Sequence, residues 1–198
     1  MHFLSKAVTA RSLAFALMLA GCAGDAERPA YPELTWTHLR PFTLDVVQIE
    51  IVSEYIPANT PPQVDHLFPL SPAKAAQGWA RGRLRAGGTS NLARFIVRDG
   101  SVIETALPRT TGVTGVVTKD QAYRYDAKLS VTLEIRDMTG RVLGQVATTV
   151  TKSRTVAENI DRDERDKIWF AMSEELAKAM DTELERAIPL HLGRWLQR

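Results

Sequence analysis

The sequence predicts an α+β fold, a two-layer sandwich in which a mostly antiparallel sheet is covered on one face by two helices. Apolar and polar residues alternate strictly over residues 123–135, which is the period of a strand with one face against a core. From Trp169 onward, apolar residues recur at every third or fourth position, as in a long helix with one buried stripe. A sheet with one apolar face needs a cover, and helices supply it.

The first half of the domain contributes a strand and then a helix. Val47, Ile49 and Ile51 alternate with polar residues, which predicts a half-buried strand over residues 44–55. Prolines then exclude regular structure up to about residue 70. Ser71-Pro72 is a favourable helix start, with a capping hydroxyl and proline at the first helical position, and Gly87-Gly88 ends the predicted helix.

Four predicted strand segments follow before the last helix. Residues 92–98 form a strand, Asp99-Gly100 indicates a turn, residues 101–107 are a candidate continuation of the sheet, and residues 108–119 form a loop or ragged hairpin. Residues 123–135 and 141–154 form an antiparallel hairpin around a turn at residues 137–140.

The last predicted element is the long helix. It begins at Asp161, whose side chain caps the helix, and Glu164 completes a capping box. Pro189 has no N–H to donate to the carbonyl of Glu185, which predicts a kink or stop near Ile188. The apolar stripe consists of Trp169, Met172, Leu176, Met180, Leu184, Ile188 and Trp195.

The N-terminal residues have the layout of a secretory signal. Lys6 and Arg11 precede an apolar run over residues 13–19, which is too short to cross a membrane because a span needs roughly 20 apolar residues. The run ends in Leu19-Ala20-Gly21-Cys22, which contains the only cysteine of the chain. This motif resembles the lipobox of bacterial lipoproteins.

The lipobox resemblance implies where the protein works. In that family the chain is cleaved between the residues that correspond to Gly21 and Cys22, and Cys22 would carry the acyl chains that anchor it to the membrane. An Asp directly after the cysteine tends to retain such proteins in the inner membrane. Ala23 stands there instead, which favours the outer membrane over the inner, with the domain on the periplasmic side.

Three segments follow from this layout: a signal peptide over residues 1–21, the lipidated cysteine and a flexible tether over residues 22–42, and a single α+β domain over residues 43–198. The whole chain has 25 basic and 23 acidic residues, and loss of residues 1–21 removes Lys6 and Arg11. The mature protein is therefore formally neutral, which gives no electrostatic reason to expect a nucleic-acid partner.

The order of elements gives a second resemblance, over residues 44–198. The order and the Ser-Pro helix containing Trp79 are similar to small envelope lipoproteins, namely the lipoprotein subunit of the lipopolysaccharide translocon and the auxiliary lipoproteins of lipid-moving ABC transporters. The resemblance implies a place beside a transport machine. It carries no functional residue over to this chain.

No motif in the chain predicts catalysis. His38, His66 and His191 lie far apart without metal-ligand spacing, and the carboxylates of Asp161, Asp163, Glu164 and Asp166 fit the capping of a helix start. No nucleophile elbow or phosphate-binding glycine loop is present. We therefore expect no enzyme activity, no cofactor and no metal site.

One basic segment is a candidate binding surface. No acidic residue occurs between Asp65 and Asp99, whereas this segment contains the candidate anion- or partner-binding residues Lys74, Arg81, Arg83 and Arg85. Lys74, Arg81 and Arg85 would share one helix face. The alternative is an ordinary solvated face, balanced by the acidic residues near Asp161.

Two functions remain open from the sequence. The first is a non-enzymatic accessory or scaffold subunit in envelope assembly or transport, which docks on an envelope protein, an anionic lipid or lipopolysaccharide. The second is a lipoprotein that binds a lipid or small ligand between the sheet and the helices, in a cavity lined by Trp79, Trp169 and Trp195.

Overall fold

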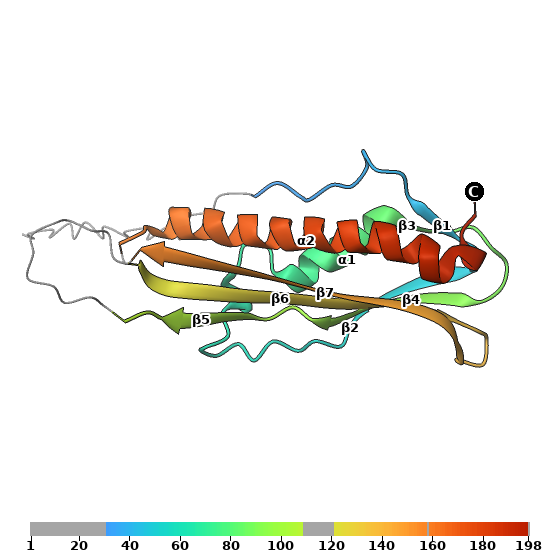
Figure 1. Cartoon of the computed structure of the whole chain (residues 1–198), viewed down its shortest axis with the longest axis horizontal. Helices are drawn as coiled ribbons and strands as arrows, with labels where there is room; N and C mark the ends of the chain where they lie inside the picture. The colour runs from blue at the N-terminus through green and yellow to red at the C-terminus, as the bar shows by residue number, and fades with distance from the viewer. Residues whose placement is uncertain (1–30, 109–120, 158, 198) are drawn as a thin grey trace, which may run out of the picture.

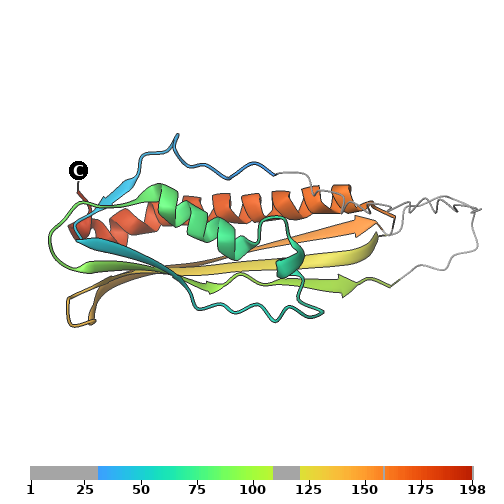
Figure 2. The same ribbon diagram turned by 180° about the vertical axis from the view of Figure 1, so that it is seen from behind.

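The computed structural model describes residues 31–108, 121–157 and 159–197. It confirms the predicted sandwich, in which a five-stranded sheet carries two helices on one face (Figure 1). Figure 2 shows from behind that both helices lie on the same side of the sheet. The lipobox and almost all of the predicted loop over residues 108–119 lie outside the described residues. No helix in the described parts of the chain is long and apolar enough to span a membrane.

The sheet is built around one long hairpin, as predicted. Strands β6 (Gln121–Arg136) and β7 (Val142–Ala157) pair antiparallel along their whole length. Gly140 closes the turn between them with φ at 88°, a conformation that glycine adopts without steric cost. The core face of β6 presents Tyr125, Leu129, Val131, Leu133 and Ile135, all of which are fully buried.

Strands β4 (Leu92–Asp99) and β5 (Val102–Ala106) lie end to end along the other edge of β6. Both run antiparallel to β6, so the chain keeps its direction at Asp99-Gly100 and the predicted turn there is wrong. The residues instead form an irregularity where the chain passes from β4 to β5 along β6. Gly100 is needed at this point because a Cβ would lie 2.7 Å from the Cβ of Ala73.

The predicted strand over residues 44–55 is two strands in two sheets. Strand β2 (Gln48–Ser53) pairs parallel with β4, whereas β1 (Phe42–Leu44) pairs parallel with β3 (Leu84–Ala86). The alternation of buried and exposed side chains changes phase between β1 and β2, since Val46 is fully buried while the next residue, Val47, is 49% exposed. The sequence interpretation missed this change because Val46 and Val47 are both apolar.

Helix α1 (Pro72–Arg83) begins as predicted, since the side chain of Ser71 accepts a hydrogen bond from the backbone N–H of Lys74. The helix ends before the predicted stop at Gly87-Gly88, because residues 84–86 form β3. The two glycines instead donate backbone hydrogen bonds to the carbonyls of Leu44 and Val46. They thereby connect β3 to the end of β1.

Helix α2 (Arg162–Leu192) confirms the predicted cap, with the N–H of Glu164 donating to Asp161 at 2.7 Å. The predicted kink or stop near Ile188 is wrong, since the helix continues through Pro189. Pro189 lies in the last turn, where few backbone bonds remain to be lost. A 3-10 turn (Gly193–Trp195) follows and buries Trp195, and a second one (Asp65–Leu67) precedes α1.

Residues 31–41, which we call the strap, lie on the outer side of the helices (Figures 1 and 2). Trp36 is only 7% exposed, and Leu34 and Leu39 pack against the core. The prediction of a flexible tether up to residue 42 is therefore wrong for this part. Tyrosine, tryptophan and leucine side chains give residues 31–42 enough apolar surface to bind the helices.

Candidate ligand-binding cleft

Up to Leu39 the strap is held to the helices by side chains rather than by its backbone, whereas the backbone carbonyl of Arg40 accepts a hydrogen bond from Arg83 of α1. Within residues 31–39 the one backbone-to-backbone hydrogen bond of the described structure is local, from the N–H of Leu39 to the carbonyl of Trp36 at 3.0 Å. The ring of Tyr31 stacks on Phe170 of α2 with centroids 5.0 Å apart. A segment attached in this way leaves space on either side of it.

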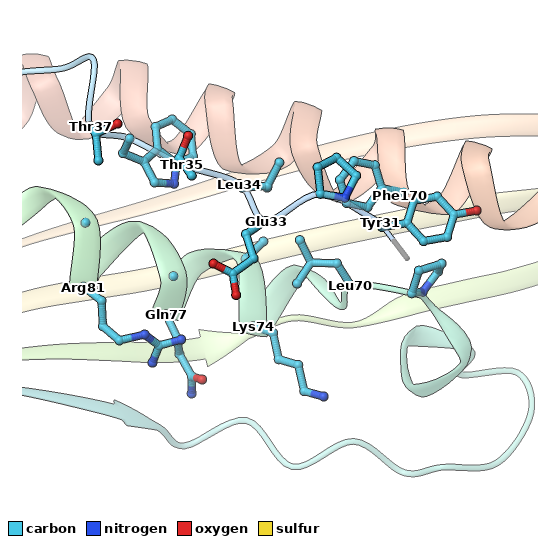
Figure 3. A pocket seen from close by; sticks show the side chains of 16 residues that line it. Tyr31, Glu33, Leu34, Thr35, Thr37, Leu70, Lys74, Gln77, Arg81 and Phe170 are labelled. Atoms are coloured by element: carbon cyan, nitrogen blue, oxygen red, sulfur yellow. The ribbon is translucent and has the colours of Figure 1, made fainter. Parts of the chain in front are cut away.

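A cleft of about 670 Å³ lies between the strap and α1 (Figure 3). Its apolar lining comes from the strap, from the loop before α1 and from both helices, and includes Leu34, Trp36, Leu70, Ala75 and Phe170. Small-molecule sites have volumes in the range of roughly 300–1,000 Å³ and combine an apolar lining with a few polar groups. The cleft has this composition.

The polar groups of the cleft come from one face of α1. Lys74, Gln77 and Arg81 stand at positions i, i+3 and i+7, and Figure 3 shows their side chains extending to the same side of the helix. Neither Lys74 nor Arg81 forms an ion pair with any residue that the structure describes. Glu33 contributes a carboxylate from the strap side.

Two glycines of α1 shape the cleft. A Cβ on Gly82 would lie 3.3 Å from Cβ and Cδ1 of Trp36, so this glycine allows the indole to pack closely on the helix. A Cβ on Gly78 would meet nothing within 4 Å, although Gly78 also lines the cleft. The space beside Gly78 is therefore open.

Two buried polar atoms of the strap lack a partner in the described structure. The Nε1 of Trp36 and the hydroxyl of Tyr31 are both shielded from solvent and accept or donate no hydrogen bond there. Burial raises the pKa of Tyr31, and the negative charges of Asp166 and Asp163 raise it further. Tyr31 therefore keeps its proton at neutral pH, and both groups remain hydrogen-bond donors.

The structure separates the four predicted basic residues. Lys74 and Arg81 line the cleft. Arg85 is exposed on β3, and its Nη1 donates to the backbone carbonyls of Arg81 and Leu84 at 2.8 Å, so it does not join them. Arg83 is 1% exposed and ion-paired with Asp181 and Glu185, so it is not available as the anion- or partner-binding residue that the sequence predicts.

The sequence interpretation missed the strap side of the cleft. The predicted tether includes the lining residues Tyr31, Glu33, Leu34 and Trp36. The aromatic and aliphatic side chains among them indicate that this segment packs against the domain. Nothing in the sequence marks Gln77 and Gly78 as site residues. Their face of α1 lines a cleft only because the strap lies opposite it.

The other predicted site residues do not form a second centre. Trp79, Trp169 and Trp195 are packed in the core rather than around the cleft. His38, His66 and His191 are exposed, and no group of three metal-binding side chains occurs in the described ranges. Of the acidic cluster, Asp166 is buried while Asp161, Asp163 and Glu164 are exposed. Gly21 and Cys22 lie outside the described residues.

A second feature is the outer edge of β7. This strand of 16 residues pairs with β6 on one side, and no other described strand pairs with it. Most of its side chains are exposed, including those of Ala147, Thr149 and Thr151. An unpaired edge of this length offers backbone donors and acceptors to another strand.

No protein-family model and no curated protein matches the chain. Among solved structures it is similar to a minor lipoprotein from Acinetobacter baumannii, with a TM-score of 0.40 and 13% identity over 80% of this chain and 99% of that one. It is also similar to a predicted lipoprotein from Caulobacter crescentus CB15, with a TM-score of 0.35 and 14% identity over 72% of this chain and 85% of that one. Scores of this size establish neither a shared fold nor a shared function.

Proposed function

We propose that this protein is a membrane-anchored lipoprotein of the cell envelope that binds a small ligand in the cleft between the strap and α1. The role is one of binding rather than catalysis. The observation that carries the proposal is the cleft itself, about 670 Å³ in volume, with an apolar lining and polar groups along one rim.

The anchor part of the proposal comes from the N-terminal motif. Cys22 would carry the acyl chains and hold the domain at the periplasmic side of a membrane, and Ala23 directly after the cysteine favours the outer membrane. Cys22→Ala should block acylation and release the protein from the membrane fraction. Membrane retention with normal processing of this variant would contradict a lipid anchor.

The binding part can be tested by filling the cleft. Gly78→Leu places a side chain in open space within it and should abolish binding of an amphiphilic fluorescent probe such as 1-anilinonaphthalene-8-sulfonate without unfolding the domain. The matched control is Gly193→Leu, because a Cβ there also meets nothing within 4 Å and Gly193 does not line the cleft. Equal binding by both variants would contradict a site in the cleft, and native mass spectrometry of the purified protein would identify a co-purified ligand.

A second candidate function is that of an accessory or scaffold subunit, and the free edge of β7 favours it. A partner strand in an envelope assembly would extend the sheet along this edge. Ala147→Lys would place a charge beside the edge and should abolish a stoichiometric crosslink to a partner in intact envelopes. Met138→Lys at the hairpin tip is the control, since this residue is 72% exposed and lies outside β7. An undiminished crosslink in Ala147→Lys would exclude the β7 edge.

A further inference from the structure

The two cations of the cleft point to the charge of its ligand. Lys74 and Arg81 lie on the same face of α1 about two turns apart, roughly 10 Å along the axis at 1.5 Å per residue. Both have long side chains and both lack an ion-pair partner among the described residues, so they can converge on one anionic group. Gln77 stands between them as a further hydrogen-bond donor.

The rest of the cleft suits an apolar chain rather than a free anion. Leu34, Leu70 and Ala75 line it, and the open space beside Gly78 continues from the polar rim. The indole of Trp36 adds apolar surface to this lining, and its Cδ1 faces Gly82 of α1.

The position of the cleft along the chain places it near a membrane. Tyr31 lines the cleft and follows Cys22 by nine positions. Nine residues span at most about 30 Å when fully extended. If Cys22 is the anchor, the cleft stays within that distance of the bilayer, which supplies molecules with one anionic group and an apolar chain.

We propose that the cleft binds an anionic amphiphile, a molecule with a phosphate or similar acidic head and at least one acyl chain, with the head held by Lys74 and Arg81 and the chain against the apolar lining. This inference rests on the proposed ligand-binding function and specifies the chemical class of the ligand. Glu33 opposes the anion from the strap, so the net charge of the cleft lining is +1 from two cations and one carboxylate.

The test compares probes that share one chain and differ in the head group. Dodecyl phosphate, dodecyl maltoside and inorganic phosphate are each titrated calorimetrically into the full mature domain below the micelle concentration. We expect dodecyl phosphate to bind at least ten-fold more tightly than either other probe, because only it satisfies both parts of the cleft. Equal affinities for dodecyl phosphate and dodecyl maltoside would overturn the anionic head while leaving a ligand-binding function intact. Equal affinities for dodecyl phosphate and inorganic phosphate would overturn the amphiphile, and no binding of any probe would overturn both proposals.

Variants of exposed residues locate the head group. Lys74→Gln with Arg81→Gln should weaken dodecyl phosphate binding about ten-fold, since each exposed cation contributes a factor of roughly two to five, and should leave dodecyl maltoside binding unchanged. Arg85→Gln is the matched control, because Arg85 is basic and exposed but bonded to the backbone outside the cleft. Glu33→Gln should strengthen dodecyl phosphate binding. An unchanged affinity in the double variant would overturn the assigned head-group position.

Discussion

The guanidinium Nε of Arg83 donates to Oδ1 of Asp181 at 3.1 Å in the buried contact between α1 and α2. The same oxygen accepts a hydrogen bond from Nε1 of Trp79 at 2.6 Å. Arg83 also donates to the backbone carbonyl of Arg40 and lies 4.7 Å from the centre of the Phe42 ring. One ion pair therefore joins both helices to the end of the strap.

Removal of Asp181 should destabilise the domain strongly. Asp181→Ala leaves the Trp79 indole N–H buried without an acceptor and removes the buried one of the two carboxylates paired with Arg83, and we expect a loss of about 2–4 kcal/mol in the free energy of unfolding. Denaturant unfolding measures it. Glu185→Ala is the control, because that side chain is 48% exposed and the loss of its ion pair should cost about 1 kcal/mol or less. Equal losses in the two variants would contradict the assignment of Asp181 as the buried partner.

Two glycines should respond oppositely to alanine. A Cβ on Gly144 of β7 would lie 2.5 Å from Cζ3 of Trp195, so Gly144→Ala should displace the indole and destabilise the domain by about 1–3 kcal/mol. Gly78→Ala meets no neighbour within 4 Å and removes a glycine from a helix interior, so it should stabilise by about 0.5–1 kcal/mol. Thermal unfolding compares the two, and a stable Gly144→Ala variant would contradict the close contact with Trp195.

The cap of α2 should be worth a measurable share of stability. The carboxylate of Asp161 accepts the backbone N–H of Glu164 at 2.7 Å, and Asp161→Ala should cost about 1 kcal/mol. Asp163→Ala is the control, because Asp163 lies in the first turn but is not the capping residue. A similar loss from both variants, measured by urea unfolding, would attribute the effect to helix-dipole charge rather than to the cap.

The β6–β7 turn should weaken in acid. The hydroxyl of Thr139 donates to Asp137 at 2.6 Å, and this bond together with those from the backbone and from Arg141 lowers the pKa of Asp137 to about 2. Because the pKa is lower in the folded state than its ordinary value of 3.8, the stabilisation is complete above that value and disappears as the pH falls toward 2.

The measurement is the unfolding free energy of the native protein and of Asp137→Asn between pH 5 and pH 2. The native protein should be the more stable of the two at pH 5, and the difference should shrink as the pH falls. A difference that does not change with pH would contradict the lowered pKa.

The sequence predicted the elements with strong local signals. The alternation through residues 123–135 and the Ser71 and Asp161 caps fix their elements by periodicity and side-chain hydrogen bonding. Local sequence patterns gave wrong predictions where tertiary contacts determine the secondary structure. Val46 and Val47 are both apolar, so the sequence does not show that the chain passes from one sheet to the other at this point. No local pattern indicates that residues 84–86 form a strand paired with β1 instead of continuing the helix.

The sequence predicted the basic residues on the α1 side of the cleft but not the residues on the strap side. Lys74 and Arg81 stood out because their segment lacks carboxylates, which is a property of the sequence alone. Arg83 has the same composition around it, yet its position on α1 turns it toward Asp181 in the core. The strap was missed because its binding to the helices depends on a groove that two elements distant in sequence create together.

The attachment of the strap also determines how the domain would respond to tension on an anchor at Cys22. A pull on Tyr31 meets stacked rings and apolar contacts, and then the bond from Arg83 to the carbonyl of Arg40, but no backbone ladder until it reaches β1. The strap would therefore peel away residue by residue at low force while the sandwich stays folded. Its release from residue 31 to residue 41 would add up to about 35 Å of reach and open the cleft on one side. If Cys22 is anchored to a membrane, one mechanical event would set both the distance of the domain from that membrane and the closure of the cleft.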